Sequence, residues 1–265
     1  MKVDVIVPLY RGKKYIDSII RMVENNSNNV KDTEVELIFV NDCPEEVISN
    51  DDIGSTLVRV HIIHNENNLG IHASRINGLL YADGDYIVFL DQDDRISDTF
   101  IKSQLSHMMN ADVVVSNGFE QHEDYSKCLY KCSFMQWTVK CMWFYTKYGN
   151  RIISPGQCLI RRTSIPEKWI ESPLVNNGSD DYMLWLLMLS RKRRFAINRE
   201  YQYIHVYTSC NLSLDKEKMS KSVLEMVDYV KDEIKEHNTN MILNRVNKNK
   251  QSRLIRTVEY VNRIR

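Results

Sequence analysis

Apolar residues follow two different spacings along the first half of this chain. Short runs rich in valine and isoleucine occur at Val3–Val7, Glu34–Val40, Leu57–Ile63, Tyr86–Leu90 and Asp112–Ser116. Runs of this length and composition are typical of β-strands. Around residues 15–23, 73–80 and 100–108, apolar positions instead recur every three or four residues, as on one face of a helix. This alternation predicts an α/β fold, a mostly parallel, doubly wound sheet with helices on both faces.

The second half of the chain has a different pattern. Residues 117–160 are rich in aromatic side chains and less periodic, and Pro155 and Gly156 mark a turn near their end. From Met219 to Ile234 one apolar stripe has helical spacing, and a second helix is expected over 242–264. We therefore expect a main domain over 1–210, with a boundary between its halves at 116/117, and a C-terminal helical extension over 211–265.

The composition argues against several classes of protein. The chain has 265 residues, of which 43% are hydrophobic, enough for a full core. Lysine and arginine number 35, as do aspartate and glutamate, so the charge balance does not favour a nucleic-acid partner. The six scattered cysteines are interpreted as reduced thiols. No apolar run approaches the roughly 18 residues that cross a bilayer. We expect a cytoplasmic protein that is not integral to the membrane.

Polar residues follow four of the expected strands. In open α/β sheets, ligands bind beyond the carboxyl ends of the strands, so these positions are the first candidates for a site. The residues there are Pro8–Arg11, Asn41 with Asp42, His64 with Asn65, and the segment Asp91–Asp94. We expect these four strand ends to meet at one edge of the sheet.

The strongest single signal is the acidic motif, Asp91-Gln92-Asp93-Asp94, which ends an apolar strand in three carboxylates. Crowded like charges are costly unless a cation neutralises them. Carboxylate oxygens suit Mg²⁺ or Mn²⁺, whose remaining positions can be filled by diphosphate oxygens and water. The motif therefore predicts a metal site. The alternative is a solvated turn whose aspartate caps the next helix.

Together these motifs resemble the family 2 glycosyltransferases of the GT-A fold, of the type that makes bacterial polysaccharides. The matching segments run in family order over about residues 1–210. They are Val5–Tyr10, Val40–Asp42, Asn68–Gly70, Arg75 with Gly78, Gly84–Tyr86, the acidic motif and Ser179–Tyr182. The resemblance implies a nucleotide-sugar-binding half over 1–116 and an acceptor-side half over 117–210.

The resemblance assigns several residues to the donor. Pro8, Tyr10 and Asp42 would frame the uracil and ribose of a UDP-sugar, while Arg75 would lie near the nucleotide and Gln92 on the same donor side. A tyrosine face can stack on a base, and an aspartate can accept from the uracil N3–H. The structural alternatives are a half-buried aromatic at a strand end for Tyr10 and an Asx turn for Asp42.

It also implies the groups around the metal. Asp93 would bind Mn²⁺ or Mg²⁺ directly, and Asp91 would hold the ribose or a metal-bound water. His205 would face the metal or the diphosphate, although a lone histidine in a strand is more often structural.

The catalytic base would come from the acidic pair Asp180-Asp181. An inverting transfer needs a base that takes the proton of the acceptor hydroxyl. By the resemblance this base is Asp181, with Asp180 as its competitor. Independently of the resemblance, Asn177–Ser179 is a turn and cap signal before an apolar helical pattern, and a helix start favours ionised carboxylates. The alternative is that both aspartates only complement the helix dipole.

The function implied is transfer of a sugar, with inversion, from a UDP-sugar to a saccharide or lipid-linked acceptor. Three departures from the family pattern weaken the residue assignments: Arg11 and Ile76 where asparagine is common, and Asp180 where glutamate is common. Two alternatives stay open. One is a non-catalytic nucleotide-sugar-binding or scaffold subunit. The other is a haloacid-dehalogenase-type phosphatase, which the position of the motif and Arg95 after it disfavour.

The C-terminal tail, residues 241–265, lies outside the resemblance. It carries seven basic residues against the single acid Glu259, and its apolar positions can form a stripe beside them. Such a helix suits the surface of an anionic membrane, at its cytoplasmic face. The alternative is packing on the catalytic domain or on a second subunit in a homo-oligomer.

Overall fold

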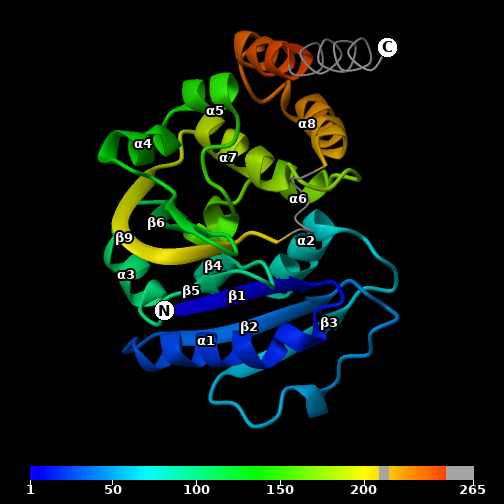
Figure 1. The fold of residues 1–265 in the computed structure, drawn as a ribbon, viewed down its shortest axis with the longest axis vertical. Coiled ribbons are helices and arrows are strands. Elements are labelled where there is room, and N and C mark those ends of the chain that lie inside the picture. Colours follow the sequence, from blue (N-terminus) through cyan, green and yellow to red (C-terminus); the bar gives the residue numbers. More distant parts are fainter. Residues whose placement is uncertain (209–214, 249–265) are drawn as a thin grey trace.

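The computed structural model describes residues 1–208 and 215–248. In these residues one mixed sheet runs in the order β3-β2-β1-β4-β8-β6-β9-β5, and β7 pairs with β6 (Figure 1). The strands are β1 Lys2–Leu9, β2 Glu34–Asn41, β3 Arg59–His64, β4 Tyr86–Phe89, β5 Arg95–Ile96, β6 Val113–Gln121, β7 Ser126–Cys128, β8 Cys158–Arg161 and β9 Phe195–Val206.

Helices join and cover these strands. The α-helices are α1 Ile16–Asn28, α2 Ile71–Tyr81, α3 Phe100–Ser106, α4 Ser133–Trp137, α5 Met142–Tyr148, α6 Glu167–Glu171, α7 Asp180–Ser190 and α8 Lys216–Val230. Short 3-10 helices are η1 Lys13–Tyr15, η2 Asn50–Asp52, η3 Thr138–Lys140, η4 Pro155–Gln157 and η5 Arg162–Ser164. Residues 236–248 are also helical.

The first half confirms the pattern of the sequence. Strands β1 to β4 are parallel, and both faces of the sheet are covered because successive residues of a strand point to opposite faces. Val5 packs in the cluster that contains Ile16 of α1 and Phe100 of α3. Its neighbour Ile6 packs in the cluster that contains α2 and α7. Two apolar cores therefore hold the sheet between layers of helices, as expected for a doubly wound fold.

The second half departs from the parallel expectation. β8 is antiparallel to both β4 and β6, and β5 is antiparallel to β9. β8 follows loops and short helices instead of one crossover helix, and an antiparallel neighbour needs no such crossover. The boundary expected at 116/117 stays a prediction for the division of function between the two halves. It lies inside β6, where the register with β9 shifts, so both halves contribute to one sheet.

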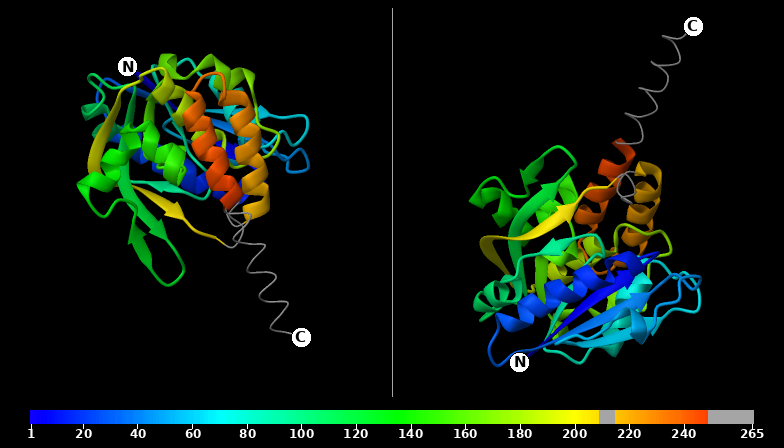
Figure 2. Two further views of the ribbon diagram at one scale, coloured as in Figure 1. Left: turned by 90° about the horizontal axis from the view of Figure 1, so that it is seen from above. Right: turned by 60° about the horizontal axis from the view of Figure 1, so that its bottom comes forward.

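The C-terminal helices pack on the layer of helices that contains α7. Met226 and Val230 of α8 and Ile242 are fully buried in the same core as α7. Each fully buried aliphatic side chain contributes about 1.5–3 kcal/mol. Figure 2 shows α8 and residues 236–248 lying side by side. Residues 241–248 therefore pack on the main domain, while 249–265 lie outside the described residues. In the described part of the chain, no helix is long and apolar enough to span a membrane.

Candidate active site

Strand β4 delivers the acidic motif to the carboxyl edge of the sheet. The strand is buried along its whole length, and the Leu90 amide still donates to the Ile6 carbonyl at 2.9 Å. The chain then leaves the ladder, and the three carboxylates of the motif meet different surroundings. One carboxylate is held in a fixed orientation, one is left open, with no hydrogen bond or salt bridge to another described residue, and one anchors a neighbouring strand.

Asp91 is the oriented one. One of its oxygens pairs with a guanidinium nitrogen of Arg75, and the other accepts a hydrogen bond of 3.0 Å from the Ser154 hydroxyl. Ser154 precedes η4 and also caps it by accepting from the Gly156 amide. Because the side chain is held from both sides, its orientation is fixed before any ligand arrives. Ser154 was not found from the sequence. Its position directly before the Pro155–Gly156 turn is the signal that could have indicated it.

Asp93 is the open one. Within the described residues its half-buried carboxylate makes no hydrogen bond or salt bridge to another residue. Burial and the negative charges of Asp94 and Asp91 raise its pKa to about 6. A carboxylate with so little compensation is a site that a cation would stabilise.

Asp94 is structural. Its carboxylate accepts from the buried Tyr203 hydroxyl and from the Val206 amide, the latter at 3.0 Å, and so anchors β9 to the acidic motif. His205 places Nδ1 3.0 Å from the same carboxylate. Burial disfavours the charged imidazole, but the hydrogen bond to Asp94 and the surrounding carboxylates outweigh it and raise the pKa of His205. The structure therefore places His205 beside the motif with one ring nitrogen on Asp94.

Arg75 joins the two acidic segments that the sequence separates widely. It is almost fully buried in α2, and its guanidinium contacts Asp91 and, at 2.5 Å, Asp180 of α7. Figure 1 shows α2 and α7 on the same side of β1 and β4. Burial disfavours the charge of both partners. The attraction between them outweighs it, raising the pKa of Arg75 and lowering that of Asp180. Asp180 is thus an ionised carboxylate whose charge is balanced by Arg75.

Asp181 is in a different state from its neighbour. It lies at the start of α7, accepts 2.7 Å hydrogen bonds from the Asn150 side-chain amide and the Tyr182 backbone amide, and is partly accessible. Burial and the charge of Asp180 raise its pKa to about 8, although Arg75 opposes this. The helix start alone predicts an ionised carboxylate, so the structure corrects the electrostatic argument from the sequence. Asn150 was not found from the sequence.

At the end of β1, the Gln92 side chain forms hydrogen bonds with the backbone of Tyr10. Its side-chain oxygen accepts from the Tyr10 amide at 3.0 Å, and its nitrogen donates to the Tyr10 carbonyl at 3.2 Å. Pro8 is buried in β1, beyond the last β1–β4 pair at Ile6. The Tyr10 ring is 46% exposed, with the guanidinium carbon of Arg11 5.5 Å from its centroid. The backbone at this strand end is fixed while the ring stays accessible to a ligand.

Asp42 holds the loop before α2. Its two oxygens accept from the Asn65 side chain and from the Leu69 and Gly70 amides, at 2.8, 2.8 and 2.9 Å. These contacts fix the segment that leads into the helix of Arg75. Contact of Asp42 with the uracil of a nucleotide stays a prediction. The carboxylate oxygens have further lone pairs that could accept a hydrogen bond from the uracil N3–H.

A metal would have to bind through few protein ligands. Among the described residues, one group of three acidic side chains lies close enough to share an ion, namely Asp4, Glu36 and Asp83. It lies at the opposite end of the sheet, and Lys2 Nζ already contacts Glu36 and Asp83. Asp91, Asp93 and His205 do not form such a group. Asp93 with the oriented Asp91 fits Mg²⁺ or Mn²⁺, ions that accept few carboxylates and keep waters and substrate phosphates.

Comparison with known sequences places this architecture in a family. The model of glycosyl transferase family 2 matches residues 4–167. An uncharacterised glycosyltransferase of Haemophilus influenzae is 32% identical over 120 residues, which are 44% of this chain and 46% of that protein. The putative teichuronic acid biosynthesis glycosyltransferase TuaG of Bacillus subtilis is 32% identical over 114 residues, or 40% of this chain and 42% of TuaG. The aligned part is less than half of either relative.

Solved structures share the fold at low sequence identity. Residues 1–349 of S. aureus TarS in complex with UDP-GlcNAc align with a TM-score of 0.63 at 16% identity, over 91% of this chain and 70% of that one. The mannosyltransferase PcManGT of Pyrobaculum calidifontis, in complex with GDP-Man and Mn²⁺, aligns with a TM-score of 0.57 at 11% identity, over 88% of this chain and 65% of that one. Since the family model covers more than half of its length, this chain belongs to glycosyl transferase family 2, and its fold is GT-A.

Proposed function

We propose that this protein is a metal-dependent, inverting glycosyltransferase. It would move a sugar from a UDP-sugar to a hydroxyl of a saccharide or lipid-linked acceptor in the synthesis of a bacterial surface polysaccharide. The observation that carries this proposal is the Arg75 bridge, because it brings the acidic motif and the Asp180-Asp181 pair into one site. The similarity to TuaG, a putative teichuronic acid biosynthesis glycosyltransferase, supports a polysaccharide product, and the UDP-GlcNAc complex of TarS supports a UDP-sugar donor.

The different surroundings of Asp180 and Asp181 support different roles for the two adjacent aspartates. Asp180 is occupied by Arg75, so its carboxylate is a poor proton acceptor. Asp181 has weaker partners and a raised pKa, which makes its ionised form the stronger base. As the acceptor oxygen bonds to the anomeric carbon, the bond from that carbon to the diphosphate breaks and the hydroxyl proton passes to Asp181.

The acidic motif would serve the leaving group. Asp93 would bind Mn²⁺ or Mg²⁺, with Asp91 held in place beside it by Arg75 and Ser154. A bound cation would supply neutralisation of the charge that develops on the diphosphate. Tyr10, whose backbone is held by hydrogen bonds to Gln92, would stack its exposed ring on the uracil of the donor.

A donor screen tests the proposal. The purified chain is incubated with UDP- and GDP-sugars, with and without saccharide and lipid-linked acceptors, and nucleotide diphosphate release is measured. We expect one UDP-sugar to give release that depends on an acceptor. Nucleotide-sugar binding without release would identify a scaffold subunit, and release of inorganic phosphate alone would identify a phosphatase.

The pH profile tests the base. Asp181 must be deprotonated to accept a proton, so kcat/KM should rise as the pH increases through the pKa of about 8 and then level off. Asn150→Ala removes an amide that stabilises the ionised form, and it should therefore move this rise to higher pH. The measurement is kcat/KM from about pH 6 to pH 10 at saturating metal. A profile that is flat below pH 8, or that does not move in the variant, would remove Asp181 from this role.

A further inference from the structure

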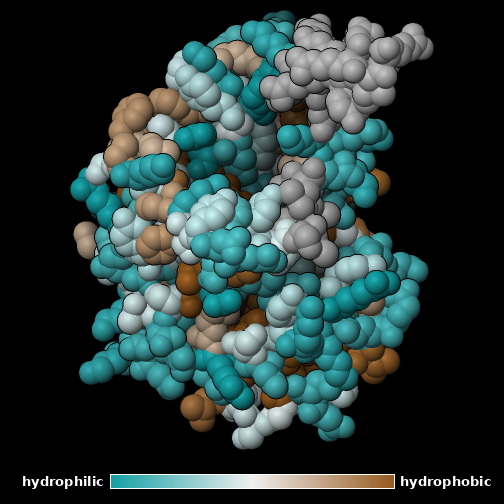
Figure 3. Space-filling view, in the orientation of Figure 1, coloured by the Kyte–Doolittle hydropathy of each residue, from teal (hydrophilic) through white to brown (hydrophobic). Residues whose placement is uncertain are grey.

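An exposed aromatic surface lies on α4 and α5, which no step of the proposed reaction uses. We define it as Phe134, Trp137, Trp143, Phe144 and Tyr148. Four of these side chains are exposed, by 61% for Phe134, 46% for Trp137, 42% for Trp143 and 55% for Tyr148. They contact one another, with ring centroids 6.0 Å apart in the Phe134–Trp137 pair and 5.7 Å apart in the Trp143–Tyr148 pair. Figure 3 shows apolar atoms gathered at the surface over α4.

The segment that carries this surface is basic. No aspartate or glutamate occurs from Ser126 to Pro166, although the chain as a whole is balanced. The basic residues in that interval are Lys127, Lys131, Lys140, Lys147, Arg151, Arg161 and Arg162. Lys131, Lys140 and Lys147 are exposed on or beside α4 and α5. Lys147 Nζ lies 4.5 Å from the Trp143 ring centroid, so cations and aromatic rings form one surface.

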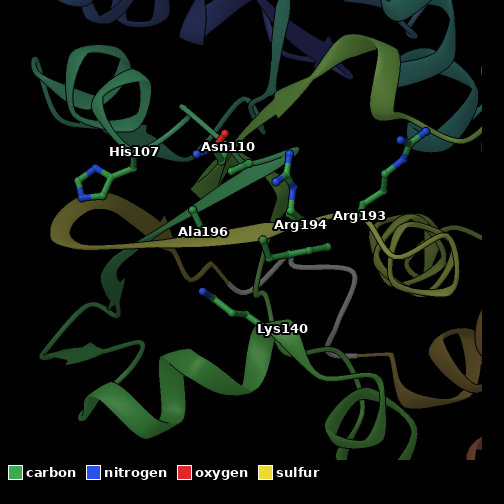
Figure 4. A pocket seen from close by; sticks show the side chains of 8 residues that line it. His107, Asn110, Lys140, Arg193, Arg194 and Ala196 are labelled. Atoms are coloured by element: carbon green, nitrogen blue, oxygen red, sulfur yellow. The ribbon is translucent and has the colours of Figure 1, made fainter.

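A shallow hollow extends the positive charge beyond η3. It has a volume of about 470 Å³, and its lining includes Lys140 together with His107, Arg193 and Arg194 (Figure 4). Lys140 is thus shared between the hollow and the short helix that links α4 to α5. Any partner of the aromatic surface meets this charge as well.

The charge argues against two occupants from the protein itself. The C-terminal residues 249–265 are the first candidate. Those residues carry five basic side chains and the single acid Glu259, so their net charge is positive, like that of the aromatic surface. A second copy that used the same surface would bring together two basic faces. Like charges at close range oppose both contacts, so an anionic partner fits best.

We propose that the aromatic surface on α4 and α5 docks on an anionic phospholipid membrane. Tryptophan, tyrosine and phenylalanine favour the boundary between lipid headgroups and acyl chains, where an apolar ring can enter while its edge stays hydrated. Lysine side chains beside them gain electrostatic attraction to anionic headgroups. The combination of exposed rings and an acid-free basic segment matches both contributions.

This docking would place the candidate base near the membrane. α5 ends at Tyr148, Gly149 with a φ of 97° turns the chain back, and the next residue, Asn150, contacts Asp181. The aromatic surface and the base are therefore connected by one short turn. Delivery of a lipid-linked acceptor to Asp181 rests on the proposed function, whereas membrane binding does not and is measured without turnover.

Cosedimentation of the full chain with vesicles tests the docking. Binding is expected with vesicles that contain phosphatidylglycerol, but not with phosphatidylcholine alone, and added salt should weaken it. Phe134→Ser with Trp137→Ser should lower the partition coefficient roughly tenfold. The matched control is Leu57→Ser with Leu80→Ser, which removes side chains 79% and 68% exposed elsewhere and should change nothing. Far-ultraviolet circular dichroism of each variant confirms that it folds.

Tryptophan fluorescence locates the contact independently. Of the four tryptophans, Trp169 and Trp185 are fully buried, so a blue shift with phosphatidylglycerol vesicles should come from Trp137 and Trp143. Trp137→Phe with Trp143→Phe should still bind but lose the shift. The proposal is overturned if the full chain does not bind, or if the Phe134/Trp137 double variant binds as well as the unmodified chain. It is also overturned if that variant instead changes the oligomeric state, or if the surface binds a soluble acidic polysaccharide and no vesicle.

Discussion

Replacing Asp181 with asparagine is expected to lower turnover by roughly 10²- to 10⁴-fold while UDP affinity changes only a few fold. Asparagine has nearly the same shape but cannot accept the proton of the acceptor hydroxyl. The nucleotide contacts proposed for Tyr10 and the acidic motif do not involve Asp181. Acceptor-dependent UDP release gives the turnover, and titration with UDP gives the affinity. Asp180→Asn should reduce turnover less.

The two variants should also change stability in opposite directions. The folded protein favours the neutral form of Asp181, so stability falls as pH rises from about 4, the pKa of an unperturbed aspartate, to the pKa of about 8. Asp181→Asn removes this cost and should raise the Tm at pH 8. The Asn150 amide can reorient to hydrogen bond with the new side chain. Asp180→Asn breaks a buried ion pair with Arg75 and should lower the Tm.

These outcomes separate catalysis from folding. Loss of activity with a raised Tm cannot come from a damaged fold, so Asp181→Asn would report chemistry alone. If Asp180→Asn abolishes turnover while Asp181→Asn retains it, the base has been assigned to the wrong member of the pair. If both variants lower the Tm, the argument from the raised pKa is wrong.

Removing divalent metal is expected to abolish sugar transfer, and adding Mn²⁺ or Mg²⁺ should restore it. The acidic motif crowds negative charge where the diphosphate would bind, and without a cation the two repel each other. Asp93→Ala should reproduce the effect of EDTA, because Asp93 is the carboxylate that no hydrogen bond or salt bridge in the described chain satisfies. The measurement is UDP release, together with binding of Mn²⁺ followed by its electron paramagnetic resonance signal.

A matched control comes from the acidic cluster at the far end of the sheet. Asp83→Ala also removes an aspartate from a group of three acids, but Lys2 already contacts that side chain. Its activity and Mn²⁺ binding should equal those of the unmodified chain. Full turnover of the unmodified chain in metal-free buffer would eliminate the metal from the mechanism and the ligand role of Asp93 with it.

The elements that could be predicted from the sequence are those whose conformation is set by neighbouring residues along the chain. β1, β2 and β4 were predicted within a residue or two, because an unbroken apolar run can be satisfied only inside a sheet. The helix that starts at Asp180 followed from a turn signal and apolar spacing. β8 and most of β9 were not found, since their short or mixed patterns gain strand form only from pairing with distant strands, β8 with β4 and β6, and β9 with β5 and β6.

The candidate site divides in the same way. The sequence by itself determined that an acidic motif ends a buried strand, that an acidic pair opens a helix, and which family the motifs resemble. Only the tertiary structure decided which carboxylates are neutralised. Arg75 forms ion pairs with Asp91 and with Asp180, which is 105 residues away from Arg75 along the chain. Asp94 instead accepts a hydrogen bond from the Tyr203 hydroxyl. Burial and neighbouring carboxylates raise the pKa values of Asp93, Asp94 and Asp181. The charge state of a carboxylate depends on its burial and on the groups within a few ångströms, and these are set by the fold rather than by neighbours in sequence.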